Sequence, residues 1–483
     1  MPERRDFDLL VIGAGAAGLS VTAVAAQLGA RVALIERNRM GGDCLNFGCV
    51  PSKALLAAAR HAAAIRAAPR FGVSAGEPQA DFARALARVH RVIAEIAPND
   101  STERFTALGA TVIRGEARFT GANTVAVNGT ILTGRRIVVA AGARAAVPPI
   151  PGLDAVPFLT SETLWRNRIP PRHLILIGGG PIGLEMALAH RRLGAEVTVL
   201  EAAAMMLGRD DPELAEGALL ALKEEGIALR DGVKIARIEG REGAVTVVLE
   251  AGDGREERIE GSHLLVAAGR RPNLDALDLD KAGVETTSLG VKVDRGLRSV
   301  SNRRVYAIGD IADIDGIGPR HFTHVGSYHA GVVIRSALFR LPAKVDYAAL
   351  PRVTYIDPEL AQVGLTEAEA RAAGHRELAI LRWPLAENDR AIAEGSTRGL
   401  VKVVATPKGR ILGAGILAPH AGEMIGMWGL AITTGAKLST VAGMIAPYPT
   451  LSEASKRAAG QAFVPKLFAP MTRRIVAWLR HFG

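Results

Sequence analysis

Cys44 and Cys49 are the residues of this chain best suited to redox chemistry. They are the only cysteines among 483 residues, and both lie in the segment Gly41–Lys53. So few cysteines in so long a chain do not form a disulfide scaffold, and a single pair cannot complete a structural zinc site. Two buried structural thiols are the plainer alternative. We expect a redox pair that opens and closes chemically in a reducing cytoplasm.

The residues around the cysteines favour a reactive thiolate. Glycines such as Gly42 let the backbone approach a flat partner closely, and Pro51 suits the first turn of a helix. A helix N-terminus and the nearby cation of Lys53 both lower a thiol pKa from its usual value of about 8.5. The segment therefore predicts a nucleophilic or electron-donating sulfur.

The segment that precedes the cysteines has the pattern of a dinucleotide-binding unit. A buried strand at 8–12 is followed by a glycine-rich turn, an Ala-rich helix and a second strand that ends at Glu36. Gly13, Gly15 and Gly18 permit the tight turn, the approach of a pyrophosphate and the packing of the helix. The helix N-terminus favours phosphate, and Glu36 can hold a ribose hydroxyl.

The same pattern recurs from 174 to Glu201, which predicts a second dinucleotide. Its glycines are Gly178, Gly180 and Gly183. Glu201 would accept a hydrogen bond from a ribose 2′-hydroxyl and repel a 2′-phosphate, so we expect NADH to be preferred over NADPH. Arg209 is near enough in sequence to leave NADPH possible.

Three further apolar runs have the pattern of strands that end against a cofactor. They end at Gly142, Gly269 and Asp310. An ordinary buried strand is the less favoured alternative for the first run, whereas an acid at a strand end, as at Asp310, is more typical of a contact with a ligand hydroxyl or phosphate network.

Composition sets the broad class of the protein. At about 150 residues per domain the length suggests three domains, and 48% hydrophobic with 22% charged residues is typical of a globular protein. The net charge is +10, but the arginines are spread along the chain and only 4% of residues are aromatic, which argues against nucleic-acid binding.

No segment of the sequence predicts insertion into a membrane. The apolar run from Leu9 to Ala30 is interrupted by glycines and fits a strand, turn and helix better than a membrane span. Asp6 and Asp8 do not fit a signal peptide, so we expect a cytoplasmic protein.

The texture of the sequence changes near Ala348. Strands near 353–356, 400–404 and 411–417 and helices at 421–434 and 452–460 predict an α+β module without a nucleotide signature. Its expected use is dimerisation or completion of a shared active site. The basic amphipathic stretch 466–481 predicts either a surface helix packed on the protein or contact with a membrane surface.

Together these motifs resemble the pyridine nucleotide-disulfide oxidoreductases. The resemblance covers nearly the whole chain and rests on Gly13–Gly18, Gly41–Lys53, Gly178–Glu185, Val305–Asp310 and Pro449–Glu453. It implies a homodimer with an α/β fold of two Rossmann-like nucleotide-binding domains and a C-terminal α+β dimerisation domain. The implied boundaries are 1–152 (FAD), 153–277 (NAD(P)), 278–347 (central, returning to the FAD domain) and 348–483 (interface).

The resemblance also implies roles for individual residues. Cys49 would be the flavin-proximal charge-transfer sulfur, Cys44 the interchange sulfur, and Lys53 would pair with Glu185 near the flavin N5. Hydride would pass from NADH to FAD, which would then reduce the disulfide. Glu36 would bind the FAD adenosine ribose, Asp310 the FAD ribitol and pyrophosphate region, and Glu201 the NADH ribose. The residues expected at the cofactors are Gly13, Gly15, Gly18, Glu36, Gly42, Lys53, Gly142, Gly178, Gly180, Gly183, Glu201, Gly269 and Asp310.

The chain departs from the family pattern at Tyr448. Disulfide reductases of the family carry an acid/base histidine there, oriented by the glutamate equivalent to Glu453. A phenol with a pKa of about 10 is a weaker base at neutral pH than an imidazole with a pKa of about 6.5. A tyrosine here is similar to mercuric reductase, where it helps to place a metal on the cysteine pair, although the second, C-terminal cysteine pair of those enzymes is missing from this sequence.

Three histidines, His321, His324 and His329, form a cluster in the sequence that could suggest a metal site. His324-Val325 instead resembles the family's Thr-His-Val segment beside the flavin, so we expect no resident metal. His321 or His329 could serve as a proton donor, and His420 is expected at an interface.

The sequence therefore predicts an FAD-dependent NAD(P)H oxidoreductase that passes electrons through the Cys44–Cys49 disulfide. Its acceptor would be a small disulfide or a soft metal ion bound by thiols, since thiolates are soft ligands. The alternatives are mercuric reductase proper, a disulfide oxidoreductase like dihydrolipoamide dehydrogenase, direct flavin reduction of quinones or oxygen, and a redox-responsive flavoprotein that acts as a binding module.

Overall fold

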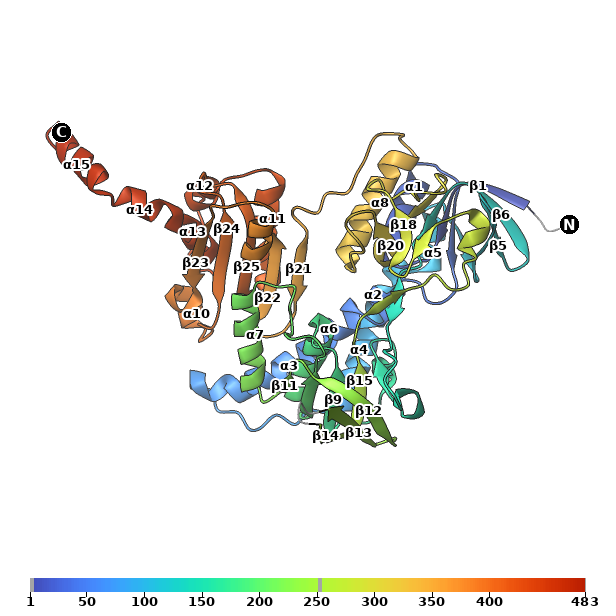
Figure 1. The fold of residues 1–483 in the computed structure, drawn as a ribbon, viewed down its shortest axis with the longest axis horizontal. Helices are drawn as coiled ribbons and strands as arrows, with labels where there is room; N and C mark the ends of the chain where they lie inside the picture. Colours follow the sequence, from blue (N-terminus) through green and yellow to red (C-terminus); the bar gives the residue numbers. More distant parts are fainter. Residues whose placement is uncertain (1–3, 251–253, 483) are drawn as a thin grey trace. The chain divides into compact units, whose positions relative to one another are not determined.

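The computed structural model describes residues 4–250 and 254–482 (Figure 1). The chain forms two compact units: the first comprises Met1–Gly178, Arg192–Glu196 and Ile235–Val345, and the second comprises Gly179–Arg191, Val197–Lys234 and Asp346–Gly483. Helices and strands alternate through much of the chain, which confirms the predicted α/β fold class. The four predicted domain boundaries stay predictions.

A mostly parallel sheet forms the core of the first unit. β1 (Arg4–Ile12) pairs in parallel with β2 (Val32–Glu36) and β6 (Thr130–Val139), and β3 (Thr111–Arg114) and β19 (Val305–Ala307) extend the parallel part. β5 (Thr124–Val127) and β4 (Arg118–Gly121) add an antiparallel edge. Leu9, Leu10 and Val11 are fully buried, as expected for a strand covered on both faces.

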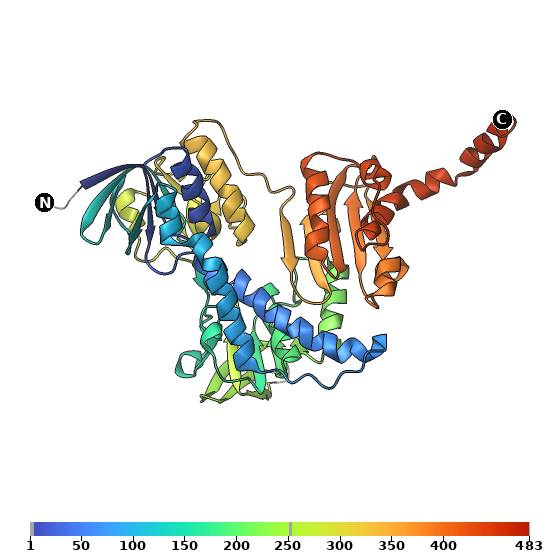
Figure 2. The same cartoon turned by 180° about the vertical axis from the view of Figure 1, so that it is seen from behind.

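Helices of the first unit position the predicted redox segment. α1 (Ala16–Gln27) packs against α8 (Thr323–Ala337), and the two lie side by side in both views (Figures 1 and 2). The short α2 (Gly42–Asn46) leads into α3 (Cys49–Ala67), which packs along α4 (Phe82–Ile96). α5 (Thr102–Ala107) precedes β3.

The first unit contains further small sheets. β15 (His263–Val266) pairs in parallel with β9 (His173–Ile177) and β8 (Leu159–Thr160). β12 (Lys234–Arg241), β13 (Ala244–Glu250) and β14 (Glu256–Gly261) form an antiparallel sheet. β7 (Ala143–Ala145) pairs with β16 (Arg270–Pro272), and β18 (Gly290–Val293) pairs with β17 (Thr286–Thr287) and β20 (Ala312–Ile314).

The second unit contains the helix of the second predicted nucleotide motif and the dimerisation module. α6 (Pro181–Arg192), β10 (Glu196–Leu200), α7 (Pro212–Glu224) and β11 (Ala228–Arg230) follow the second glycine turn, and β10 and β11 pair in parallel. This order of strand, turn, helix and strand is the one that the sequence predicted.

An antiparallel sheet forms the rest of the second unit, in the order β21 (Pro351–Thr354), β22 (Glu359–Gly364), β25 (Ile411–Ala418), β24 (Leu400–Ala405), β23 (Ala379–Pro384). Ala414 and Ile416 of β25 share a core with α11 (Ala421–Thr433), whereas Gly415 lies against Leu214 of α7. Because successive strand residues point to opposite faces, the two helices cover opposite faces of the sheet. α9 (Glu367–Ala372), α10 (Asp389–Ala393), α12 (Leu438–Gly443) and α13 (Glu453–Gly460) surround it.

These elements agree with the strands and helices predicted after Ala348, with ends that differ by a few residues. The largest difference is at β21, which ends at Thr354 instead of reaching 356. The physical reason is that the backbone N–H of Tyr355 leaves the sheet and donates to Glu185 Oε1 at 3.1 Å.

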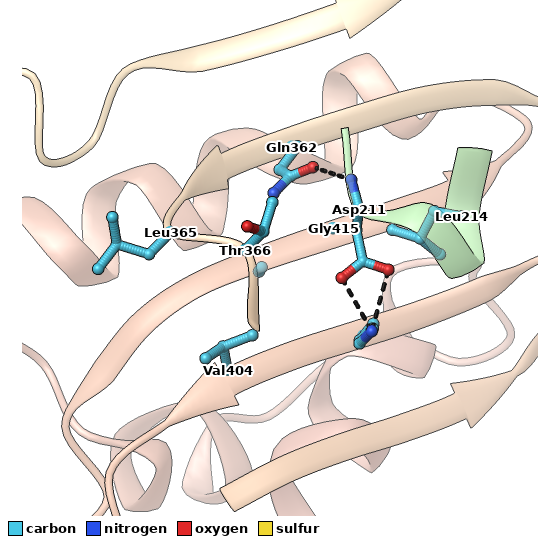
Figure 3. A pocket seen from close by; sticks show the side chains of 9 residues that line it. Asp211, Leu214, Gln362, Leu365, Thr366, Val404 and Gly415 are labelled. Atoms are coloured by element: carbon cyan, nitrogen blue, oxygen red, sulfur yellow. Dashed lines mark hydrogen bonds and ion pairs between the residues drawn. The ribbon is translucent and has the colours of Figure 1, made fainter. Parts of the chain in front are cut away.

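A buried ion cluster joins α7 to the sheet of the second unit. Lys402 of β24 is only 5% exposed, and its Nζ lies 2.8 Å from Asp211 Oδ2, 3.0 Å from Glu213 Oε2 and 3.6 Å from Glu367 Oε2. Asp211 is the N-cap residue of α7, and its backbone N–H donates to Gln362 Oε1 at 3.0 Å; both residues line the small pocket in Figure 3. The cluster holds a cation and a carboxylate in a nearly dry environment.

The predicted basic amphipathic stretch forms α15 (Pro470–Leu479), preceded by the short α14 (Val464–Leu467). Neither helix has a buried residue within the second unit, so the unit itself provides no packing surface for them. Among the helices of the described residues, none has the length and apolar character to cross a membrane.

Candidate active site

The two cysteines lie at the junction of two helices. Cys44 is in α2 and is half-buried, whereas Cys49 is the first residue of α3 and is exposed; both are free thiols. This position places the Cys49 sulfur at a helix N-terminus, where the peptide dipoles favour a negative charge.

The cysteine segment is fixed directly onto the first glycine turn. Gly41 forms a parallel bridge with Gly15, and its backbone N–H donates to the carbonyl oxygen of Ala14 at 2.9 Å. A Cβ added to Gly42, whose φ is +58°, would lie 2.6 Å from the Cα of Gly15. Only glycine fits this contact, so the redox segment and the predicted FAD site form one structural element.

The environment of the two cysteines shifts their pKa values in opposite directions. The pKa of Cys49 is lowered to about 6, first by a hydrogen bond from Cys44 and then, against the effect of burial, by Thr323 and the charge of Lys53. Cys49 Sγ lies 3.3 Å from Thr323 Oγ1. The pKa of Cys44 is raised by its hydrogen bond to Cys49 and by burial. The reduced pair at neutral pH is therefore a Cys49 thiolate beside a Cys44 thiol.

We expect alkylation of the reduced protein to show that Cys49 has a lower pKa than Cys44. The rate of Cys49 modification by iodoacetamide should rise with pH with a midpoint near 6, well below the usual thiol pKa of about 8.5. Peptide mapping by mass spectrometry checks which sulfur reacts. In Thr323→Val the midpoint should move upward, because the thiolate loses a hydrogen-bond donor, and in Cys44→Ala it should move further, because Cys44 is the largest stabilising partner.

A Thr120→Val variant is the matched control, since that residue lies on β4 of the same unit and its hydroxyl donates to Thr124 Oγ1 at 2.9 Å. An unchanged midpoint in both Thr323→Val and Cys44→Ala would contradict the assignment of the low pKa to these hydrogen bonds.

Glu36 and Glu201 occupy equivalent places in the two nucleotide motifs. Glu36 Oε2 accepts from the backbone N–H of Ala14 at 2.7 Å, and Glu201 Oε2 accepts from that of Gly179 at 2.7 Å. Each carboxylate thus fixes the glycine turn of its own motif at the strand end where a ribose is expected.

The first glycine turn fits a bound dinucleotide. Gly13 has a φ of +105°, and a Cβ there would lie 2.4 Å from the carbonyl oxygen of Ala140; Gly178 repeats this against Ala267 with a φ of +116° and the same distance. No acidic residue lies in the first turn of α1, and Gly15 gives it no side-chain cap. The N-terminal N–H groups can therefore face a pyrophosphate.

The remaining predicted glycines lie where the motifs require them. Gly15 caps α1, Gly18 packs that helix against Gly13, and Gly183 lies in the first turn of α6, just after Gly180. Gly142 and Gly269 have φ values of +67° and +131° and lead from their strands into the paired β7 and β16.

A chain of charged groups that sequence reasoning missed links the redox segment to Asp310. Arg270 lies 3.2 Å from Asp43 and 3.1 Å from Asp310, and all three side chains are at least half-buried. Burial raises the pKa of Asp43 despite Arg270. Burial would also raise the pKa of Asp310, but His321 and Arg270 outweigh it and lower that pKa. The sequence feature that could have indicated this chain of charged groups is Asp43, an acidic residue between Gly42 and Cys44.

The three clustered histidines have separate partners. His329 is fully buried and accepts from the backbone N–H of Gly309 at 3.0 Å, and burial lowers its pKa to about 4. His321 Nδ1 lies 3.7 Å from Asp310, and His324 stacks on Phe322. Within the described residues, no three His, Cys, Asp or Glu side chains gather as a metal site.

Lys53 and Glu185 lie in different units, so their pairing near the flavin stays a prediction. Lys53 Nζ donates to Ser52 Oγ at 3.3 Å within the first unit. Glu185 is only 5% exposed, on α6 of the second unit, and holds the N–H of Tyr355.

Tyr448 has a carboxylate partner that the sequence did not indicate. Its side chain is exposed, and its hydroxyl donates to Asp389 Oδ2 at 2.9 Å, a contact that raises the phenol pKa. Glu453, the predicted orienting residue, forms an ion pair with Arg457 at 2.8 Å. Tyr448 is therefore a protonated phenol at neutral pH, and its catalytic role stays a prediction.

Comparison with known protein families gives two matches. The family described as pyridine nucleotide-disulphide oxidoreductase matches residues 7–333, and the dimerisation domain of that family matches residues 350–459.

Individual relatives cover nearly all of the chain. A mercuric reductase of Lysinibacillus sphaericus is 36% identical over 94% of this chain and 82% of its own length, and a dihydrolipoyl dehydrogenase of Geobacillus stearothermophilus is 35% identical over 94% and 96%. Among solved structures, the Cu(II) complex of the HOCl-induced flavoprotein disulfide reductase RclA from Escherichia coli is similar with a TM-score of 0.82 and 29% identity. That alignment covers 93% of this chain and 98% of that one.

Proposed function

The chain belongs to the pyridine nucleotide-disulphide oxidoreductases, and from this premise we propose that its Cys44–Cys49 pair delivers electrons from NADH to a soft metal ion held by thiols. Enzymes of the family depend on FAD and NAD(P)H. The named relatives are enzymes, so this chain is an enzyme, and the binding-module alternative is set aside.

The observation that carries the proposal is the thiolate and thiol pair fixed on the first glycine turn. When bound at this turn, FAD supplies the relay of reducing equivalents between the nicotinamide and the sulfurs. Cys49, with a pKa of about 6, holds negative charge at neutral pH, and Cys44 supplies a second sulfur beside it. Two adjacent sulfurs can ligate a soft ion, and the proton of Cys44 leaves to solvent as the metal binds.

The tyrosine at position 448 favours a metal ion over a disulfide as the electron acceptor. A disulfide acceptor needs a group that gives and takes protons as thiols leave, and a phenol whose pKa is raised by Asp389 is a poor base for this. Reduction of a bound Hg(II) needs no such proton transfer: NADH and Hg(II) give NAD⁺, a proton and Hg(0). The names of the relatives agree with this reading, since one is a mercuric reductase and another was solved as a Cu(II) complex.

Disulfide reduction is the second candidate, and the dihydrolipoyl dehydrogenase relative favours it. In this reaction NADH, one proton and one disulfide give NAD⁺ and two thiols. The Cys49 thiolate and Cys44 can perform the exchange. The rate would be limited by the missing imidazole at 448.

The experiment that separates the two is anaerobic NADH oxidation by the FAD-loaded enzyme, with Hg(II) in excess thiol or with oxidised lipoamide. We expect turnover with Hg(II) that exceeds turnover with lipoamide. Tyr448→His should lower the first and raise the second, and Tyr448→Phe is the control that removes the hydroxyl without adding a base. Lipoamide turnover in the native enzyme that exceeds metal turnover would favour the second candidate, and no turnover with either would refute both.

The nicotinamide preference is a separate prediction. Glu201 follows the last residue of β10, and neither Ala202 nor Ala203 after it supplies an arginine, so NADH should have a kcat/KM higher than that of NADPH by about 10-fold or more. Replacing Glu201 with alanine should lower the ratio of kcat/KM for NADH to kcat/KM for NADPH. Most of the change should be a lower KM for NADPH, because the carboxylate that repels the 2′-phosphate is removed. Steady-state kinetics with both nucleotides measure this. A native ratio near one would show that Arg209 compensates for the carboxylate.

We also propose that the enzyme works as a homodimer in the cytoplasm. The family's dimerisation domain, which matches residues 350–459, supports the dimer, and the reducing compartment would keep the cysteine pair in turnover.

A further inference from the structure

An apolar face is exposed along α15 and its flanking residues. Met471, Ile475, Trp478 and Phe482 are 68%, 50%, 61% and 70% exposed. Their spacing places them on one face of a helix, and the rings of Trp478 and Phe482 pack edge to face at 4.7 Å. Leu467, Phe468 and Leu479 are further exposed apolar side chains of the same segment.

All charged side chains in the C-terminal segment that contains α14 and α15 are positive. From Ala454 to Gly483 the sequence contains six lysines and arginines and no aspartate or glutamate. Arg473 and Arg480 lie seven positions apart, on the side of α15 away from Ile475, and Arg474 flanks the apolar face. A helix with aromatic and aliphatic residues on one side and arginines on the other has the composition of a helix that lies in a membrane interface.

We propose that α14 and α15 dock this enzyme onto a lipid surface with anionic headgroups. The apolar face would lie at the boundary between headgroups and acyl chains, with Trp478 at the polar edge, and Arg473, Arg474 and Arg480 would contact phosphates. The overall charge of +10 adds a long-range attraction to the same surface. The proposal is independent of which acceptor the cysteines reduce.

Charge argues against a second copy of the chain as the occupant. A second copy carries the same all-cationic segment and the same net charge of +10. The matched dimerisation domain also ends at residue 459, before Val464, where α14 begins. An anionic surface complements the segment, whereas an identical chain repeats its charge.

The test is flotation of the FAD-loaded protein with vesicles of phosphatidylcholine alone or with about one-third phosphatidylglycerol. The full chain should float with the anionic vesicles only, and binding should weaken with added salt. The double variant Arg473→Gln with Arg474→Gln should lose about 25-fold in affinity, at roughly five-fold for each cation. A chain that stops after Phe463 should lose binding and keep its NADH oxidation.

Two neighbouring residues give a matched control. Ile475 and Val476 are equally exposed, at 50% and 51%, but only Ile475 lies on the apolar face. Ile475→Gln should lose most vesicle binding, whereas Val476→Gln should keep it. The proposal is overturned if the full chain does not float, if both variants bind alike, or if truncation turns dimers into monomers without a change in flotation, which would assign the face to a second copy.

Discussion

In the Cys44→Ala enzyme, turnover with thiol-bound Hg(II) or with lipoamide falls to about one-thousandth of the native value or less. The reason is that either acceptor must bond to the Cys44 sulfur, and Cys49 alone cannot form the dithiol. NADH should still bleach the bound flavin in a single anaerobic addition, because that step uses neither sulfur. Stopped-flow absorbance for the flavin and steady-state NADH oxidation for turnover measure the two steps.

Ser20→Ala is the matched control for Cys44→Ala, since Ser20 lies in the same unit, on α1, and its hydroxyl bonds to the carbonyl oxygen of Ala16 and to Ser327. Turnover that persists without Cys44 would show that electrons leave the flavin directly, toward a quinone or oxygen. The Cys49→Ala variant should fail in the same way as Cys44→Ala, which ties the loss to the pair.

The second large effect concerns stability. Replacing Lys402 with methionine should destabilise the second unit by about 3–5 kcal/mol, because the buried Asp211 would lose its cation while Glu213 and Glu367 stay near it. Differential scanning calorimetry of the native and variant proteins should show a fall in Tm of about 6–20 °C, at about 2–4 °C for each kcal/mol. The chain has two units, so the transition of the second unit is the one to compare.

Lys408→Met is the matched control, because Lys408 is an exposed lysine in the turn after β24, and its Tm should stay near the native value. Adding Asp211→Asn to Lys402→Met should recover part of the loss, since the uncompensated charge is removed. A Tm for Lys402→Met equal to that of Lys408→Met would show that solvent reaches the cluster and screens it.

The redox segment and the nucleotide motifs could be predicted because their signals are local. Gly13, Gly42 and Glu36 belong to short patterns in which the spacing along the chain determines the backbone conformation. The structure places Gly42 against Gly15, with Glu36 on the N–H of Ala14, as such patterns require.

Residues that tune the chemistry were missed because their partners are distant in sequence. Thr323 reaches Cys49 across 274 positions, and Arg270 reaches Asp43 although nothing in the sequence relates the two. Asp389 reaches Tyr448 in the same way, across 59 positions. A hydrogen bond between such groups depends on how helices and strands pack, which no local pattern encodes.

The stabilising role of Lys402 likewise could not be predicted from the sequence. A lysine within Leu400–Ala405 suggests an edge strand with a solvated side chain. The strand instead lies inside its sheet, between β25 and β23, and the N-terminus of α7 supplies Asp211 and Glu213 from 191 and 189 positions away. Burial and pairing of the charge are properties of the packed sheet and helix.

The sequence by itself determined the family and the fold class and predicted the redox pair, because glycine turns and cysteine spacing act through the backbone within a few residues. Only the tertiary structure decided which sulfur holds the charge, what Tyr448 contacts and that the face of α15 is exposed. Each of these depends on desolvation and on neighbours brought together by folding, and these set pKa values and exposed surface.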